Sequence, residues 1–174
     1  MALQGTQPEN KSFLSPIGFQ FGIQKLPHVN YFCTAAGIPD ISLGQVDTID
    51  NTFIKLPTPG DKLTFGALNI TFQVDEDLKN FKEIYDWMIG LGFPDNFQQS
   101  AAIGRTITTA GEIYSDASLI ILTGGNTPNI EVKYIDVYPV SLSALDFDLQ
   151  ATDVEYLKAT ATFAYRKYDL TTMK

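Results

Sequence analysis

The chain has 174 residues, of which 44% are hydrophobic and 18% charged, and its formal net charge is −8 at pH 7. This composition excludes disordered and fibrous chains and predicts one globular domain over residues 1–174, long enough to bury a core. The acidic balance argues against a sequence-independent grip on phosphates, because that grip needs clustered Lys and Arg. No apolar run approaches the roughly 20 residues needed to cross a bilayer, so we expect no membrane span.

The N-terminal half is patterned for β-structure. Residues 1–11 are polar and aperiodic and predict a mobile arm, whereas residues 17–23 alternate as a strand and residues 28–35 form a second apolar run. We interpret residues 45–74 as a long β-hairpin whose turn is the Pro- and Gly-rich cluster at 57–61. In its second arm the period of two places Asn69, Thr71 and Gln73 on one face, opposite an apolar face.

The period then changes to that of a helix. Residues 76–90 predict an α-helix with an apolar stripe, made by Leu78, Phe81, Ile84, Tyr85 and Met88. The acidic residues at 75–77 suit the positive end of the helix dipole, and we expect an aspartate there to cap the helix.

The C-terminal half returns to β-patterns after a weakly patterned excursion at 95–116. Strands are predicted at 117–122, at 129–138 with an interruption at Pro139, at 145–150 and at 157–166. The polar faces of the last two strands carry Asp146, Asp148, Gln150, Thr160 and Thr162. The fold class is therefore mainly β: an antiparallel β-sandwich or open barrel with one flanking α-helix.

The sequence gives little support to catalysis, a cofactor or a metal. His28 is the only histidine, which removes the Ser-His-Asp, Cys-His and multi-histidine zinc arrangements, and Cys33 lies in an apolar run typical of a buried thiol. Asp146 and Asp148 could be a carboxylate pair, but a solvated strand face explains them more simply. The single cysteine and the lack of a secretory segment at the start predict synthesis in a reducing compartment.

Small uncharged side chains on the polar strand faces are the most informative feature. On a monomer they would be the wet side of an antiparallel sheet. In a ring of subunits the same face could line a lumen, and ring closure would pair strand edges that are otherwise open.

Five stretches together resemble the tail-tube proteins of contractile-tailed bacteriophages, over most of residues 17–170. They are FQFGIQ, YFCTAAGIP, FIKLPTPGDKLTFGALNITFQVDED, the helix FKEIYDWM, and the ending IDVYPVSLSALDFDLQATDVEYLKATATFAYRKYDL. The ending departs from the family where Tyr168-Asp169 replaces a tryptophan-acid pair. Both the main tube subunit and a baseplate tube initiator fit the resemblance.

The resemblance implies hexameric rings with a shared inner β-barrel, stacked into a tube through which DNA passes without specific binding. It further implies the sheath, baseplate and tape-measure proteins as partners, and a virion tail assembled in the host cytoplasm. Strand alternation then assigns an acidic lumen face to Asn69, Thr71, Gln73, Asp146, Asp148, Gln150, Thr160 and Thr162. Inter-ring contacts are expected from residues 1–11 and from the turn residues Thr58, Pro59, Gly60 and Asp61.

Two alternatives remain open at this point. A tube protein of a tail-derived bacterial secretion or injection machine would share the architecture and the acidic composition. A monomeric carbohydrate-binding β-sandwich would instead need exposed aromatics gathered on one face, whereas most aromatics here fall on apolar faces.

Overall fold

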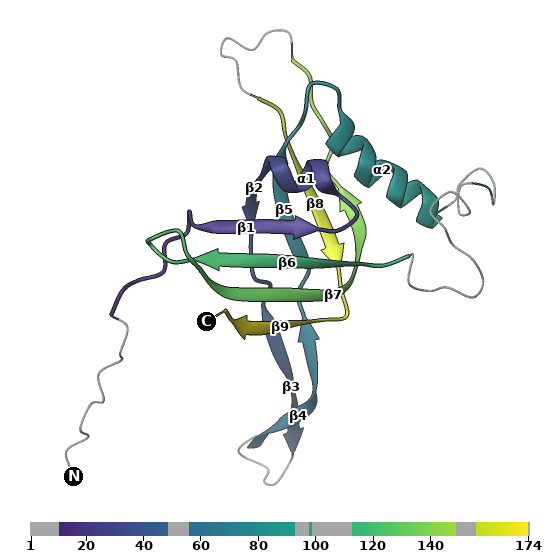
Figure 1. The fold of residues 1–174 in the computed structure, drawn as a ribbon. Helices are drawn as coiled ribbons and strands as arrows, with labels where there is room; N and C mark the ends of the chain where they lie inside the picture. Colours follow the sequence, from purple (N-terminus) through teal and green to yellow (C-terminus); the bar gives the residue numbers. More distant parts are fainter. Residues whose placement is uncertain (1–10, 49–55, 93–97, 99–112, 149–155, 174) are drawn as a thin grey trace.

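The computed structural model describes residues 11–48, 56–92, 98, 113–148 and 156–173 (Figure 1). Its elements, in chain order, are β1 (Phe19–Ile23), α1 (Pro27–Phe32), β2 (Cys33–Ala36), β3 (Ile41–Thr48), β4 (Leu56–Phe65), β5 (Leu68–Gln73), α2 (Lys79–Gly92), β6 (Ser115–Leu122), β7 (Pro128–Leu142), β8 (Lys158–Ala164) and β9 (Lys167–Thr172). The predicted fold class is confirmed in that the described chain is mainly β and every strand pair is antiparallel.

Seven strands form one bent sheet in the order β1-β6-β7-β8-β5-β2, and β9 joins it beside β7. The long strand β7 makes the bend. Its first half pairs with β6 and β9, and its end pairs with β8 across a register shift between Pro139 and Ser141. Figure 1 shows β1, β6, β7 and β9 side by side, with β2, β5 and β8 running across them. The sheet does not close, because β1 and β2 are its two ends.

The core lies inside this bend. From β5 and β8 it receives alternate residues, among them Leu68, Ile70 and Phe163, which are fully buried. From the other half it receives Val132 and Tyr134, also fully buried. Burial of each large apolar side chain contributes about 1.5–3 kcal/mol, so the strands with the strictest alternation fix the fold.

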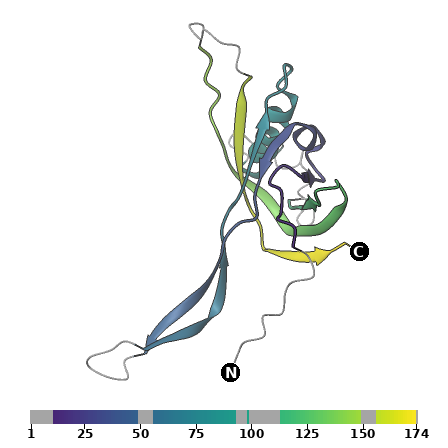
Figure 2. The same cartoon turned by 90° about the vertical axis from the view of Figure 1, so that its left-hand side faces the viewer.

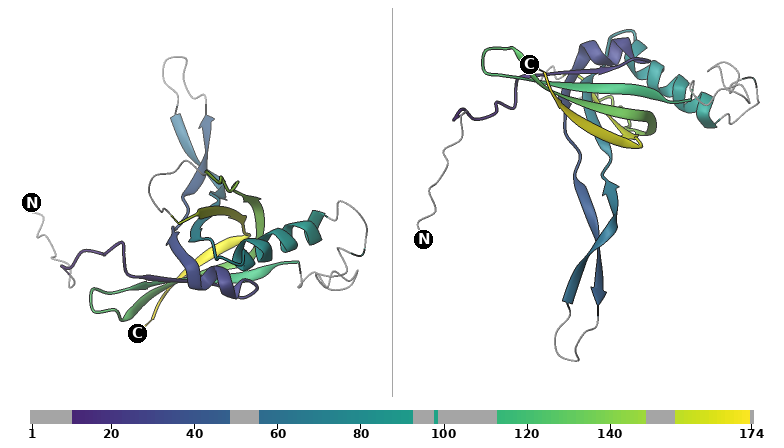
Figure 3. Two further views of the ribbon diagram at one scale, coloured as in Figure 1. Left: turned by 90° about the horizontal axis from the view of Figure 1, so that it is seen from above. Right: turned by 60° about the horizontal axis from the view of Figure 1, so that its bottom comes forward.

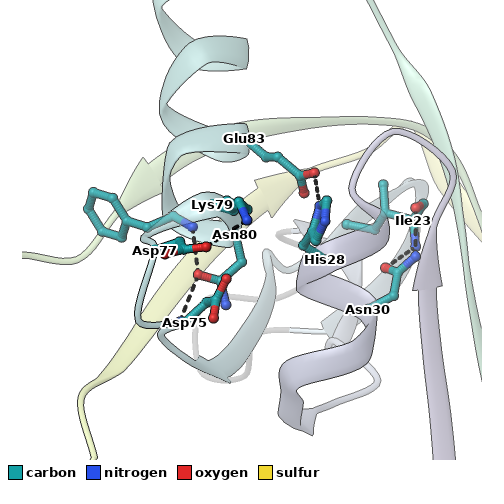
Figure 4. Close-up of polar contacts among 9 residues, drawn as sticks. Ile23, His28, Asn30, Asp75, Asp77, Lys79, Asn80 and Glu83 are labelled. Carbon is teal, nitrogen blue, oxygen red and sulfur yellow. Dashed lines mark hydrogen bonds and ion pairs between the residues drawn. The ribbon is translucent and has the colours of Figure 1, made fainter.

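Helix α2 covers one side of the core but begins three residues later than predicted. Asn80 is fully buried and donates from Nδ2 to the carbonyl of Gln73 (2.7 Å). Its Oδ1 accepts from the amides of Asp75 (3.2 Å) and Phe81 (2.8 Å) (Figure 4). The expected aspartate cap is therefore wrong, because an asparagine satisfies the free amide and also ties the helix to β5. Asp77 instead pairs with Lys79 (2.6 Å), and this contact lowers the pKa of its carboxyl.

The apolar stripe of α2 is also shifted. Ile84 and Trp87 are buried, whereas Tyr85 is 51% exposed. The buried face is made by residues 80, 84 and 87, which share a side at helical spacing. Trp87 contacts Phe163 and donates from Nε1 to the carbonyl of Ile113 (3.2 Å).

The strand predicted at 28–35 is wrong in its first half, because these residues belong to a second helix, α1. Pro27 stands at the first turn of α1, where its fixed φ suits a helix and its missing N–H costs nothing. Val29 is fully buried, and Asn30 bonds both backbone groups of Ile23, accepting from its amide (2.7 Å) and donating to its carbonyl (2.9 Å). These contacts favour the helix over the local β-pattern, and only Cys33–Ala36 continues as a strand.

The hairpin also differs from its prediction. β3 pairs with β4, so residues 57–61 lie within a strand, and the connection falls at 49–55, outside the described residues. Figures 2 and 3 show this two-stranded ribbon projecting far from the bent sheet. Prolines fit there because both strands of a ribbon are edges. Beside Pro59, the register shift between Leu43 and Gln45 places Gly44 against three residues of β4, where the turn-forming sequence makes a bulge instead of a turn.

Three C-terminal details differ as well. Pro139 does not interrupt β7, because it sits at the register shift opposite Phe163. Residues 143–148 are not a strand, contrary to the prediction for 145–150. The final segment forms β9 on the edge of β7. The sequence pattern did not predict β9, because most side chains of β9 are exposed on both faces and do not alternate in polarity.

Candidate assembly surfaces

The outer face of β5 and β8 is polar along its whole length. β5 and β8 pair so that Asn69 lies opposite Thr162, Thr71 opposite Thr160, and Gln73 opposite Lys158. The residues between them point the other way and are buried. Of the eight residues predicted to share a surface, the structure thus brings together Asn69, Thr71, Gln73, Thr160 and Thr162.

Hydrogen bonds join the members of this face across the strands. Thr162 Oγ1 donates to Asn69 Oδ1 (2.8 Å), and the hydroxyls of Thr71 and Thr160 lie 3.4 Å apart. Thr34 extends the ladder toward β2, since its hydroxyl donates to the carbonyl of Thr71 (3.1 Å). These contacts hold the short side chains close to the backbone, so the face is smooth and offers few mobile groups.

The other side of β8 is joined by the chain after β7. Ser143 exchanges two bonds with Thr160: its Oγ accepts from the Thr160 amide (2.9 Å), and its amide donates to the Thr160 carbonyl (2.9 Å). Sequence reasoning missed Ser143 and Thr34 because neither lies in a clear alternation. Both residues lie beside a strand edge, and this position can be recognised only once the register of the paired strands is known.

Charge on this face is lower than predicted. None of the paired residues of β5 and β8 carries a carboxylate, and Lys158 contributes a cation. Asp146 and Asp148 are exposed in the segment that follows β7, not on a strand. Gln150 lies outside the described residues. The face is therefore mainly a hydroxyl and amide surface with one cation, Lys158, and with two acidic residues nearby along the chain.

Open strand edges flank the polar face. Within the described residues, β2 pairs only with β5, and the end of β7 pairs only with β8. Unpaired N–H and C=O groups at such edges are a template for another strand. This four-stranded unit therefore has a polar outer face, an apolar inner face and two edges that can accept neighbours.

The projecting ribbon exposes apolar side chains. Ile41, Leu43, Val46 and Leu63 are each more than half exposed. Since a lone two-stranded ribbon is marginally stable in water, and this one buries little against its own chain, it needs an external surface to cover it. Thr58, Pro59, Gly60 and Asp61 lie within this ribbon, in β4; their predicted contact with another ring is untested and stays a prediction.

The described residues contain no group of three His, Cys, Asp or Glu side chains able to hold a metal. His28 contacts Glu83 across α1 and α2 and is half-exposed (Figure 4). Burial raises the pKa of the Cys33 thiol to about 11, so the thiol stays protonated and weakly nucleophilic at neutral pH. No described helix is long and apolar enough to span a membrane.

A bent antiparallel sheet with a flanking helix, a polar outer face, open edges and an apolar projecting ribbon is a class of fold that offers several surfaces for contacts between subunits. Comparison with known proteins identifies the family. The model of the phage tail tube protein family matches residues 6–171, and the chain belongs to this family. Its members are structural tube proteins, so the resemblance of the sequence to tail-tube proteins is confirmed.

Solved structures from contractile injection systems share the fold. The tube-terminating cap of the anti-feeding prophage aligns with a TM-score of 0.63 at 18% identity, covering 99% of this chain and 100% of the cap chain. A chain from the PVC sheath–tube complex in the extended state aligns at 0.61 and 13%, covering 94% of each chain. The PVC sheath/tube terminator aligns at 0.59 and 15%, covering 93% and 99%. No curated protein sequence matches the chain.

Proposed function

We propose that this protein forms hexameric rings that stack into a tail tube, with the polar face of β2, β5, β8 and the end of β7 lining the lumen. The observation that carries the proposal is this face itself: cross-strand pairs of Thr and Asn side chains, flanked by two open strand edges. Pairing of those edges between six subunits would close a shared inner barrel and leave the apolar faces buried.

The tube would conduct DNA during ejection without binding it. Sequence-independent affinity for DNA comes mainly from Lys and Arg that displace counterions from phosphates. The face carries Lys158 as its charged strand residue, while the whole chain has a net charge of −8. Asp146 and Asp148, which follow β7 along the chain, would make the lumen acidic there. Neutral hydroxyls and amides beside acidic residues give a passing duplex little to hold.

In the tail, the ring would contact the sheath outside, the tape-measure protein inside and the baseplate at one end, within a virion assembled in the host cytoplasm. Two places along the tube suit the fold, the main shaft and the baseplate initiator.

A tail-derived injection machine is the second candidate. It is favoured by the structural similarity to the anti-feeding prophage cap and to the PVC tube assembly. Its tube would carry protein cargo instead of DNA through the same polar face.

The monomeric carbohydrate-binding alternative fits the structure poorly. Such sites use exposed aromatic platforms, but Trp87 lies on the buried face of α2, and the rings of Tyr134, Tyr165 and Tyr168 pack on one another.

Electron microscopy of the purified protein tests the proposal. Wild-type protein should give rings or tubes, and a reconstruction should place Thr71 and Thr160 at the lumen. If these side chains faced the exterior or lay buried between subunits, the assignment would be wrong. Leu43→Asp with Leu63→Asp should leave the circular dichroism spectrum unchanged but prevent tube formation, because charges would replace apolar contacts of the ribbon.

Ser42→Asp with Thr64→Asp is the matched control, since it places the same two charges on the same two strands at the neighbouring pair of the ribbon. It should still give tubes. Deletion of Thr58–Asp61, which a turn would tolerate, is a poorer test, because these residues pair with β3 and their removal would shift its register.

A further inference from the structure

The edge of β1 is open at one end of the bent sheet. Gly18 accepts from the amide of Leu122 (2.9 Å) and Gln24 donates to the carbonyl of Asp116 (3.3 Å), so the even-numbered residues of β1 face β6. Ile23 points its amide and carbonyl the other way, where the side chain of Asn30 takes both. By the same alternation the backbone groups of Phe19 and Phe21 point away from β6.

Those backbone groups have no hydrogen-bond partner in the part of the chain that the structure describes. They face a groove of about 540 Å³ between β1, α1 and the start of β2. Its lining combines the apolar or aromatic residues Phe19, Phe21, Pro27, Tyr31 and Cys33 with the polar residues Gln20 and Asn30. A strand edge beside a groove with apolar side chains is the arrangement that binds an extended peptide by strand addition.

The segment before β1 has the matching character: residues 11–15 have no regular secondary structure, and Pro16 and Ile17 form a turn that strand addition would straighten. Phe13 is fully exposed, Leu14 is 64% exposed and Ile17 is 88% exposed. Figures 1 and 2 show this segment leaving the start of β1 and running away from the sheets, and its three large apolar side chains are not buried by their own subunit. Three large apolar side chains in so short a stretch indicate a surface that is buried in an assembly.

The proline in this segment fixes which backbone side can pair. Pro16 lacks an N–H, and within sheets proline is confined to positions whose N–H side faces away from a partner strand. Phe13, Ser15 and Ile17 would then present their amides to the neighbour, with Leu14 and Pro16 facing outward. The side chains of Phe13 and Ile17 fall on one face, as an apolar groove requires.

We propose that residues 13–17 of one subunit add as a strand to the open edge of β1 in a second copy of this chain, with Phe13 and Ile17 in the groove beside Cys33. The interaction rests on the proposed self-assembly and specifies one contact within it. It leaves the polar face and the ribbon free for their own roles.

Disulfide trapping tests the contact directly, because Cys33 is the only cysteine. Phe13→Cys and Ile17→Cys, each in a Cys33→Ser background, are mixed with wild-type protein, assembled and oxidised with copper–phenanthroline. A covalent dimer on a non-reducing gel is expected from at least one of the two variants. Thr123→Cys with Cys33→Ser, in the exposed turn between β6 and β7, is the control and should give none.

Two proline substitutions provide a second measurement. Ser15→Pro removes an amide that pairs in the proposal and should abolish assembly, whereas Leu14→Pro removes one that faces outward and should retain it. Two results would overturn this contact and leave the proposed function standing. In the first, wild-type protein forms rings or tubes, but neither cysteine variant cross-links above the control. In the second, both proline variants assemble equally well. Wild-type protein that forms no ring would contradict the proposed function itself. A fast-migrating intramolecular disulfide in Phe13→Cys with native Cys33 would show that the segment folds back on its own subunit, which would also overturn the contact.

Discussion

Replacement of Asn80 by Ala should destabilise the subunit more than its small size suggests. The side chain is fully buried and bonds the carbonyl of Gln73 and the amides of Asp75 and Phe81. Its removal leaves at least the Gln73 carbonyl and the Asp75 amide without partners. A buried unpaired group costs about 1–3 kcal/mol, and both residues are half-buried, so we expect about 2–3 kcal/mol in total. For a chain of this size that corresponds to a fall in Tm of roughly 5–10 °C.

Urea unfolding followed by circular dichroism measures this loss, under conditions where sedimentation shows monomers, so that assembly does not add to the apparent stability. Asn69→Ala is the matched control, because Asn69 is exposed and accepts one bond from Thr162; it should cost less than about 0.5 kcal/mol. Asn80→Asp adds a pH test. A buried carboxyl facing the Gln73 carbonyl would have a raised pKa, so its penalty should shrink as pH falls below that pKa. Equal stability of Asn80→Ala and Asn69→Ala would refute the reasoning.

The remaining predictions concern the tyrosine cluster and the ribbon. Tyr134→Phe should lower the free energy of unfolding by about 1 kcal/mol, since the Tyr134 hydroxyl donates to the carbonyl of Gly37 (3.1 Å). Tyr165→Phe should be neutral or stabilising, because the buried Tyr165 hydroxyl has no partner among the described residues. Burial, with a contribution from Tyr168, raises the pKa of Tyr165 from 10 to about 12, so the folded state holds this proton more tightly. Stability should then fall as pH rises from 10 to 12, and less steeply in Tyr165→Phe; an identical pH profile in urea titrations would contradict this. Gly60→Ala should disrupt the ribbon, because a Cβ there would lie 2.5 Å from the carbonyl oxygen of Gly44, and loss of tubes with an unchanged unfolding midpoint would be the expected result.

Sequence patterns predicted the parts of the fold in which burial and local preference agree. β5 and β8 alternate strictly because one face meets the core and the other does not, so the polar ladder could be read from the sequence. The position of the ribbon turn could not. Residues 57–61 have the composition of a turn, but pairing with β3 and the bulge beside Gly44 decide their conformation. Such long-range pairing leaves no local signal.

The helix α1 shows the same limit from the other direction. Val29, Tyr31 and Phe32 have β-type preferences, and a short segment of this kind favours a strand on propensity alone. Burial of Val29 and the two bonds from Asn30 to Ile23 outweigh that preference. Asp146 and Asp148 were predicted on a strand for a related reason. A half-buried strand requires an alternating pattern, but the pattern forms a strand only where a partner strand is available.

In the proposed tube, the polar face and the acidic chain would act at different distances, so that one subunit could both repel and release a polyanion. At physiological salt the field of exposed carboxylates fades within about 8 Å, so the net charge of the chain governs approach more than contact. At contact, the polar groups of the wall decide the adhesion, and hydroxyls already paired across strands, such as Thr162 with Asn69, have little capacity left for a passing phosphate. A wall of lysines would bind the cargo, and a wall of unpaired carboxylates would keep it at a distance. In the proposed lumen, cross-strand pairing of short neutral side chains would provide a third solution, in which the surface is wet and has little affinity for the cargo.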